Sequence, residues 1–213
     1  MHTHTTTRHT LLAGLAAAAL ATSGCELPDL DTLAPGAPSA PATGTPRELP
    51  ALAVAAEDTG AHYDRDDWPH WTSLGDGCDV RDAVLQAQGQ GVRTGSDCAV
   101  SGRWVSVYDG ATVTDSSELD IDHLVPLAEA ARSGARHWTQ AQRERFANDP
   151  AGLVAVTATS NRQKGDQDPA EWLPHRDRCG YIARWVDIKH TYGLTADPAE
   201  AAAIRAAWAR CPR

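Results

Sequence analysis

The feature that most constrains this chain is a short stretch of mixed polar and apolar residues that ends in proline. It comprises residues 118–126, with the sequence ELDIDHLVP. It predicts a strand that carries an aspartate directly before a histidine, Asp122-His123. Successive strand side chains point to opposite faces, so a strand end or a turn has to re-aim one of the two. Pro126 supplies that end, because proline has no N–H to continue a ladder. Such a pair can place a carboxylate on a divalent cation while the imidazole faces a water molecule.

A second polar motif follows at residues 161–166, with the sequence NRQKGD. Its Asn161 could give a cation a neutral oxygen ligand, which suits magnesium better than zinc because hard cations prefer oxygen. Taken alone, an Asp-His pair usually marks a solvated turn, and an asparagine commonly caps a helix or lies inside one. Together with an apolar strand expected at Leu153–Val156, the two motifs predict a metal-dependent nuclease site. For Asp120 two roles stay open, a carboxylate behind the ligands or a plain polar strand residue.

These motifs resemble those of the HNH endonuclease superfamily, in its secreted branch with Asp-His-[Ile/Leu/Val]-Val-Pro. The resemblance runs from about Gly75 to the C-terminus and is most specific at Leu119–Ala130 and Leu153–Pro174. It implies a ββα-metal fold, in which a strand, a long loop, a second strand and a helix hold one cation. The roles that it implies are general base for His123 and metal ligand for Asp122 and Asn161.

The chain departs from the family pattern at one position. The family usually has an asparagine at the start of the second strand, where this chain has Gly152. In the family that asparagine braces the loop that holds the histidine and does not touch the metal. We expect Asn148 or Asp149 to take over this bracing.

The charge balance is unfavourable for nonspecific binding of nucleic acid. The chain has 19 basic and 28 acidic residues, a formal net charge of −9, and such a protein is repelled by nucleic acid at long range. A bound cation would offset the repulsion at the site. We expect Arg162 and Lys164 to contact phosphate there; the alternative is that both are solvated helix residues.

The N-terminus has the pattern of an export signal. The apolar run Leu11–Ala21 follows Arg8 and is too short to span a bilayer. It ends in Thr22-Ser23-Gly24-Cys25, which is similar to the lipobox of bacterial lipoproteins, although Thr22 stands where that motif usually has leucine. We therefore expect a signal peptide at 1–24 and acylation of Cys25, with ordinary signal cleavage as the alternative. The Ala-, Pro-, Thr- and Gly-rich residues 25–60 are expected to form a flexible tether, and residues 61–213 the folded domain.

Five cysteines are an odd number for an exported protein. Assigning Cys25 to a lipid leaves Cys78, Cys98, Cys179 and Cys211, none of which forms a Cys-x-x-Cys pair. Disulfides are therefore expected in an oxidising compartment, and a structural zinc site is not. The sequence leaves three pairings open, of which we favour the local one, Cys78–Cys98 with Cys179–Cys211.

Local signals predict several helices. Asp79 and Asp82 are expected to open a helix that runs to Gln88, with Gly89 as its stop. Thr139 with Gln142 has capping-box spacing for a helix through Phe146. Two copies of Asp-Pro-Ala-Glu each present an N-cap followed by proline. These expected helix starts lie at Asp168–Glu171 and Asp197–Glu200, and further helices are expected at Leu124–Ser133, Cys179–Tyr192 and Pro198–Arg210.

A hairpin is expected before the motif strand. Residues 100–103 (VSGR) are predicted to form its turn, with Trp104–Tyr108 as its second strand and Asp109-Gly110 closing that strand. The complete expectation is an α+β protein with a ββα-metal (HNH/His-Me finger) core, flanking helices, this N-terminal hairpin and two disulfides.

The expected function is hydrolysis of phosphodiester bonds in nucleic acid, with DNA favoured over RNA. Magnesium is the expected cofactor and manganese the alternative. The expected location is extracellular or on the cell surface, held by a lipid at Cys25. The competing hypothesis is a non-catalytic surface lipoprotein that binds DNA or an envelope partner, which the acidic balance and Gly152 favour. Neither His-Glu-x-x-His nor Gly-x-Ser-x-Gly occurs, so the motifs of metalloproteases and serine hydrolases are absent from the sequence.

The assignment of Cys25 leads to a direct prediction. If Cys25 carries a diacylglyceryl group, two chains hold the protein on membranes more firmly than one would. Full-length protein should therefore sediment with membranes, and Cys25→Ser should release it or block its processing. Fractionation followed by N-terminal sequencing tests this. A wild-type protein found only in the medium, with a first residue other than Cys25, would contradict it.

Overall fold

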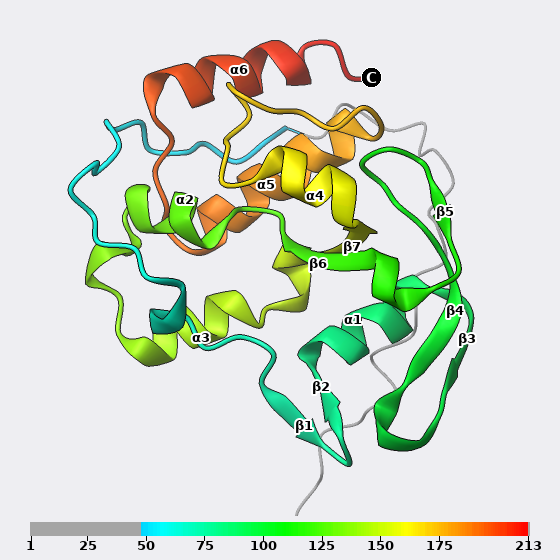
Figure 1. The fold of residues 1–213 in the computed structure, drawn as a ribbon. Helices are drawn as coiled ribbons and strands as arrows, with labels where there is room; N and C mark the ends of the chain where they lie inside the picture. The colour runs from blue at the N-terminus through cyan, green and yellow to red at the C-terminus, as the bar shows by residue number, and fades with distance from the viewer. Residues whose placement is uncertain (1–47, 213) are drawn as a thin grey trace, which may run out of the picture. The chain divides into compact units, whose positions relative to one another are not determined.

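The computed structural model describes residues 48–212. The motif-bearing strand β6 (Leu119–His123) pairs antiparallel with β7 (Leu153–Thr157), and helix α4 (Ala158–Lys164) follows β7 directly (Figure 1). A long loop with its own helices separates the two strands. This strand, loop, strand and helix, together with the surrounding helices and sheets, confirm the expected α+β fold with an HNH-like core.

The two faces of the β6–β7 pair differ because side chains alternate along each strand. On one face, Leu119, Ile121 and Ala155 are buried in a cluster with residues of helix α1 (Val80–Gln88). Asp120 and Asp122 alternate with these residues and lie on the other face, where α4 contacts both strands. The alternation therefore gives the strand pair a hydrophobic face against α1 and carboxylates on the side of α4.

Helix α1 begins and ends as its sequence predicts. Asp79 caps it and forms a capping box with Asp82, and Gly89 follows its last residue. Gln88 at its end also completes the edge of β7: its Nε2 donates to the carbonyl oxygen of Leu153 at 3.0 Å, and its Oε1 accepts from the N–H of Ala155 at 2.9 Å. An otherwise open strand edge is thus covered by one amide side chain.

Two small sheets precede β6. Strand β1 (Ser73–Gly75) pairs with β2 (Cys78–Asp79), and β3 (Gln90–Thr94), β4 (Val100–Val105) and β5 (Thr112–Val113) form a three-stranded antiparallel sheet. The turn expected at residues 100–103 is wrong, because β4 runs through them and the chain reverses at residues 96–98. Gly102 is small for a packing reason: a Cβ there would lie 3.1 Å from Cγ2 of Val92 and 3.3 Å from Cη2 of Trp104.

Four further α-helices complete the domain: α2 (Leu127–Arg132), α3 (Gln140–Ala147), α5 (Arg178–Thr191) and α6 (Pro198–Trp208). Thr139 and Asp197 form the predicted capping boxes of α3 and α6. The helix expected from Asp168 is wrong. Its first turn forms, with the N–H of Trp172 donating to the carbonyl oxygen of Asp168 at 2.9 Å, but Pro174 disfavours a helical conformation in the residue before it. Short 3-10 turns lie at Arg65–Asp67, Ser96–Cys98, Ser116–Glu118, Ala135–His137 and Pro150–Gly152.

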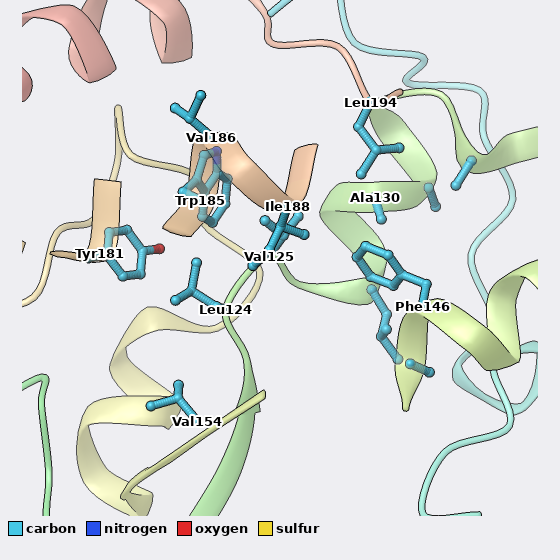
Figure 2. Packing of buried hydrophobic residues seen from close by; sticks show 14 of the residues in the cluster. Leu124, Val125, Ala130, Phe146, Val154, Tyr181, Trp185, Val186, Ile188 and Leu194 are labelled. Atoms are coloured by element: carbon cyan, nitrogen blue, oxygen red, sulfur yellow. The ribbon is translucent and has the colours of Figure 1, made fainter. Parts of the chain in front are cut away.

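The main hydrophobic core lies between these helices and the segment that follows β6. Figure 2 shows Trp185 and Ile188 of α5 close to Leu124 and Val125, which directly follow His123. Leu124, Val125 and Trp185 are all at most 1% exposed. The chain on the C-terminal side of the motif strand is therefore fixed by apolar packing, which holds the strand end in place.

A buried ion network joins α2, α5 and α6. Nζ of Lys189 lies 2.6 Å from Oε1 of Glu129 and 2.6 Å from Oε2 of Glu200, and it also donates to Oγ of Ser133 at 3.1 Å. All three charged residues are fully buried. Removing one partner from such a network leaves a charge unpaired in the interior, which typically costs about 3–5 kcal/mol. The network therefore fixes how the three helices pack.

The folded domain extends upstream of residue 61. Residues 48–58, which the sequence assigned to the tether, lie against it: the N–H of Ala55 donates to the carbonyl oxygen of Ala196 at 3.0 Å, and Glu57 pairs with Arg132 at 3.1 Å. The composition of this segment hides these contacts because they are mostly backbone hydrogen bonds. The signal peptide, Cys25 and the rest of the tether lie outside the described residues.

Both expected disulfides are present, Cys78–Cys98 and Cys179–Cys211. The first joins β2 to the turn before β4, and the second joins the start of α5 to the residues after α6. Within residues 48–212, no helix is long and apolar enough to cross a membrane.

Candidate active site

His123 is the last residue of β6, and only 7% of it is exposed. Its Nε2 lies 2.8 Å from the carbonyl oxygen of Ala147. A carbonyl can only accept a hydrogen bond, so Nε2 carries the proton and Nδ1 is left as the basic nitrogen. Burial is the main reason that the pKa of His123 falls from 6.5 to about 4. The imidazole is therefore neutral at neutral pH.

Asp122 is held at both carboxylate oxygens. Tyr108 donates its hydroxyl to Oδ2 at 2.6 Å, and Nζ of Lys164 donates to Oδ1 at 2.9 Å. Burial raises the pKa of Asp122, while the Lys164 ammonium and the Tyr108 hydroxyl oppose the rise. Two donors thus fix the carboxylate in one orientation. Since a carboxylate has about four acceptor positions, each oxygen keeps lone pairs for another partner.

Asn161 lies on α4, opposite the acidic face of β6. Its Nδ2 donates to Oδ2 of Asp120 at 3.1 Å. Because the amide nitrogen is turned to Asp120, the amide oxygen is the atom that remains to bind a cation. Of the two roles left open for Asp120, this contact favours a carboxylate that orients the side chain of Asn161.

Lys164 does not fit the phosphate-binding role expected for it. The residue is fully buried, and its Nζ donates to the carbonyl oxygen of His123 at 3.0 Å as well as to Asp122. A phosphate outside the protein cannot reach this ammonium. Lys164 instead ties α4 to the end of β6. The motif contains two basic residues, and its spacing does not show which of them faces solvent. In the structure Arg162 is exposed, as expected, and Lys164 is buried.

The carboxylate of Asp109 fixes the start of α4. Its Oδ2 accepts from the hydroxyls of Thr157 and Ser160, the latter at 2.7 Å. Burial would raise the pKa of Asp109, but these hydrogen bonds and one from the N–H of Ala111 lower it to about 2. The carboxylate is therefore charged at neutral pH and sits at the N-terminus of the helix, where negative charge is favourable.

The motif residues share one cleft of about 370 Å³. Asp122 and His123 line it from β6, and Asn161 and Arg162 line it from α4. Tyr63 and Arg65, from a segment upstream of the family motifs, also line it. The structure thus brings the expected base, the expected ligands and an exposed arginine to a single concave surface.

Asn148 and Asp149 hold the loop between α3 and β7. Nδ2 of Asn148 donates to the carbonyl oxygens of Pro69 and Glu144, each at 2.8 Å. Oδ1 of Asp149 accepts from the N–H of Ala151, and its Oδ2 accepts from the hydroxyl of Tyr192 at 2.8 Å. These contacts hold the loop between α3 and β7, and the bracing of the histidine loop by Asn148 or Asp149 stays a prediction.

Gly152 leaves room where the family has a longer side chain. A Cβ built there would meet nothing within 4 Å, and its backbone is outside the left-handed region. Its carbonyl oxygen accepts from the N–H of Leu124 at 2.8 Å, which links this loop to the residue after His123.

Two residues near the site carry no motif and were missed by the sequence analysis. The first is Tyr108, which was expected only to end a strand and which donates its hydroxyl to Asp122. The second is Trp71, which stacks on the His123 ring with ring centroids 5.8 Å apart and an angle of 27° between the ring planes. The clustering of aromatics at residues 63–71 was the only signal for Trp71.

This arrangement, a β-hairpin-like strand pair followed by a helix with Asp122, His123 and Asn161 at one cleft, is that of an HNH-type nuclease. Comparison with known proteins agrees. A family model described as the C-terminal domain of GmrSD restriction endonucleases matches residues 90–207. The chain belongs to this family, and its function is related to that of nucleases.

A curated relative extends the match beyond the family domain. An uncharacterized secreted protein of Arthroderma benhamiae is 41% identical over 176 residues, which cover 80% of this chain and 86% of that protein. No solved structure gives a significant match.

The low pKa of His123 predicts how stability depends on pH. In the unfolded chain the imidazole takes up a proton near pH 6.5, but in the fold it does so only near 4. Between pH 6.5 and about 4 the unfolded chain therefore binds a proton that the fold does not, so stability falls by about 3 kcal/mol over this range and does not depend on His123 above it. NMR titration of the His123 ring should give the low pKa directly. A ring that titrates near 6.5 in the folded protein would contradict the buried, neutral imidazole.

Proposed function

We propose that this protein is an exported, cation-dependent endonuclease that hydrolyses phosphodiester bonds of nucleic acid, DNA in preference to RNA. The observation that carries the proposal is the protonation of His123, whose proton lies on Nε2, together with its place in the cleft. A neutral imidazole presents Nδ1 as its basic atom, and it lines the same cleft as the oxygen donors of Asp122 and Asn161. A base and a pair of oxygen ligands at one surface are what hydrolysis of a phosphodiester requires.

The donor set fits a hard divalent cation. Asp122 supplies a carboxylate with lone pairs to spare, and Asn161 supplies an amide oxygen whose orientation is fixed by Asp120. Both donors are oxygens, with no thiolate among them, which suits magnesium or manganese. The ammonium of Lys164 balances the negative charge of Asp122. The carboxylate of Asp120, beside Asn161, supplies further negative charge to attract a cation.

The three carboxylates of Glu57, Asp168 and Asp197 are another group among the described residues, with ligand atoms within 4.8 Å of one another. Each already has a structural partner: Glu57 pairs with Arg132, Asp168 accepts from the N–H of Ala170, and Asp197 caps α6. We therefore favour the cleft as the cation site.

The chain's own residues can perform the proton transfer. Nδ1 of His123 takes a proton from a water molecule in the cleft, and the Ala147 carbonyl stabilises the imidazolium that forms. The exposed guanidinium of Arg162 binds the phosphate and orients it. When bound, a divalent cation stabilises the negative charge that develops on the phosphate and the leaving oxygen.

Export fits the two disulfides, which persist in oxidising compartments, and the relative described as secreted. We further propose that the mature chain is held at the cell surface by an acyl group at Cys25. This places the active cleft outside the cell, where nucleic acid would be an extracellular substrate.

The proposal is tested by cleavage of plasmid DNA and of RNA with the purified mature protein. Cutting should require magnesium or manganese and stop on addition of EDTA. His123→Ala should lower the rate by at least about 100-fold, the usual scale for loss of a general base, while calorimetry shows that the cation still binds. Asn161→Ala should weaken cation binding, and excess cation should restore part of its rate.

His190→Ala is the matched control, because His190 is exposed on α5 outside the cleft; it should cut as fast as the wild type. Loss of cation binding in His123→Ala would contradict the assignment of base and ligands. Firm binding of DNA without cutting under any metal would instead select the non-catalytic binding protein.

A further inference from the structure

Trp71 occupies a backbone conformation that a bulky side chain rarely adopts. Its φ is +58°, in the left-handed region, where non-glycine residues persist only when the surrounding structure over-determines them. Its indole covers one face of the His123 imidazole, with a ring distance of 5.8 Å. Residue 71 also precedes the span 90–207 that matches the family model. The contact therefore joins His123 to a residue outside the span that the family model matches.

Both ends of the short segment that carries Trp71, residues 68–72, are tied to the domain. At one end Trp68 is 2% exposed and packs against Trp138 and the edge of Phe146. At the other end the N–H of Thr72 donates to Oδ1 of Asn148 at 3.0 Å.

The middle of the segment is tied as well. Nδ2 of Asn148 donates to the carbonyl oxygen of Pro69 at 2.8 Å, and Nδ1 of His70 lies 2.8 Å from the carbonyl oxygen of Trp68. The His70 ring also packs edge-on against Trp71, with ring centroids 5.4 Å apart. These contacts fix the backbone on both sides of Trp71 and place the His70 ring against its indole.

The indole stacks on the face of the His123 ring and restricts its tilt, while the His70 ring packs edge-on against His123 with ring centroids 6.4 Å apart. The Ala147 carbonyl fixes the Nε2 edge of the His123 ring, but a single hydrogen bond permits the ring to tilt about that edge. A stacked indole removes this freedom, because aromatic rings in contact keep offset-stacked or edge-to-face arrangements. Nδ1 is then held at one place in the cleft.

We propose that Trp71 is a positioning residue for His123: it holds the imidazole in the orientation that presents Nδ1 to the substrate water, and the segment 68–72 is the clamp that holds Trp71. The kinetic consequence of this inference rests on the proposed nuclease function. The effect on the imidazole itself does not.

Two substitutions separate the ring from the backbone. Trp71→Phe keeps an aromatic ring in the stack, whereas Trp71→Gly keeps the positive φ without strain and removes the ring. We expect Trp71→Gly to lower kcat about tenfold or more with KM within a factor of two, since small misplacements of a catalytic group have effects of this size. Trp71→Phe should keep at least about half of the wild-type kcat. Equal kcat in Trp71→Gly and wild type, or an equal loss in both variants, would overturn the proposal.

A second readout needs no activity. NMR relaxation of the isotope-labelled His123 ring should show a rigid imidazole in the wild type and in Trp71→Phe, and motion of the ring about its side-chain torsions in Trp71→Gly, with the proton on Nε2 in all three. A His123 ring that is equally rigid in Trp71→Gly and in the wild type would overturn the proposal even if kcat fell. If the wild type cuts no nucleic acid, the proposed function fails and this spectrum still decides the role of Trp71. Should Trp71→Gly not fold, as judged by circular dichroism, Trp71→Leu replaces it with the same expected loss.

Discussion

The buried ammonium of Lys164 sets the geometry on which the rest of the site depends. It lies 2.9 Å from Asp122 and 3.0 Å from the carbonyl oxygen of His123, and its side chain is not exposed at all. A buried ammonium is tolerated only while its charge and its hydrogens have partners. Helix α4 therefore cannot move from the end of β6 without a large cost. The same contact keeps Asn161, one turn earlier on α4, opposite the acidic face of the strand.

His123 depends on more distant parts of the chain. Its backbone belongs to β6, its Nε2 bonds to the residue that ends α3, and its ring face is covered by Trp71. Asn148, next to Ala147, holds the segment that carries Trp71. One loop thus positions the imidazole twice, once through its own carbonyl and once through the indole. Burial by these three segments is also what keeps the imidazole neutral.

The predictable parts of this structure are those that depend on residues close in sequence. Asp79, Thr139 and Asp197 open the helices that their capping patterns indicate, because a capping box needs partners only three residues apart. Both disulfides follow from cysteine parity and from the preference for local pairing. The strand pair, and the cleft shared by Asp122, His123 and Asn161, follow from motifs spread over two segments that resemble those of the family.

Except for the helix expected at Asp168, the failures have a common cause, which is contact with distant residues. Gly102 suggested a turn, but it is small because Val92 and Trp104 pack over it within a sheet. The pattern at Asp168 predicts a helix start that Pro174 prevents from extending. Lys164 looked like a phosphate ligand, yet its place in the helix points it into the protein. The role of Trp71 could not be predicted because it exists only once residues far apart in the sequence meet.

The central claim is that Asp122 and Asn161 hold a divalent cation beside a neutral His123. Anomalous diffraction from crystals of the protein soaked in manganese tests it most directly. We predict a peak in the cleft within about 2.0–2.6 Å of an oxygen atom of each side chain, the range for hard cations and oxygen ligands, with Nδ1 of His123 outside that range. A peak confined to the carboxylates of Glu57, Asp168 and Asp197, or manganese bound directly to the imidazole, would contradict the account.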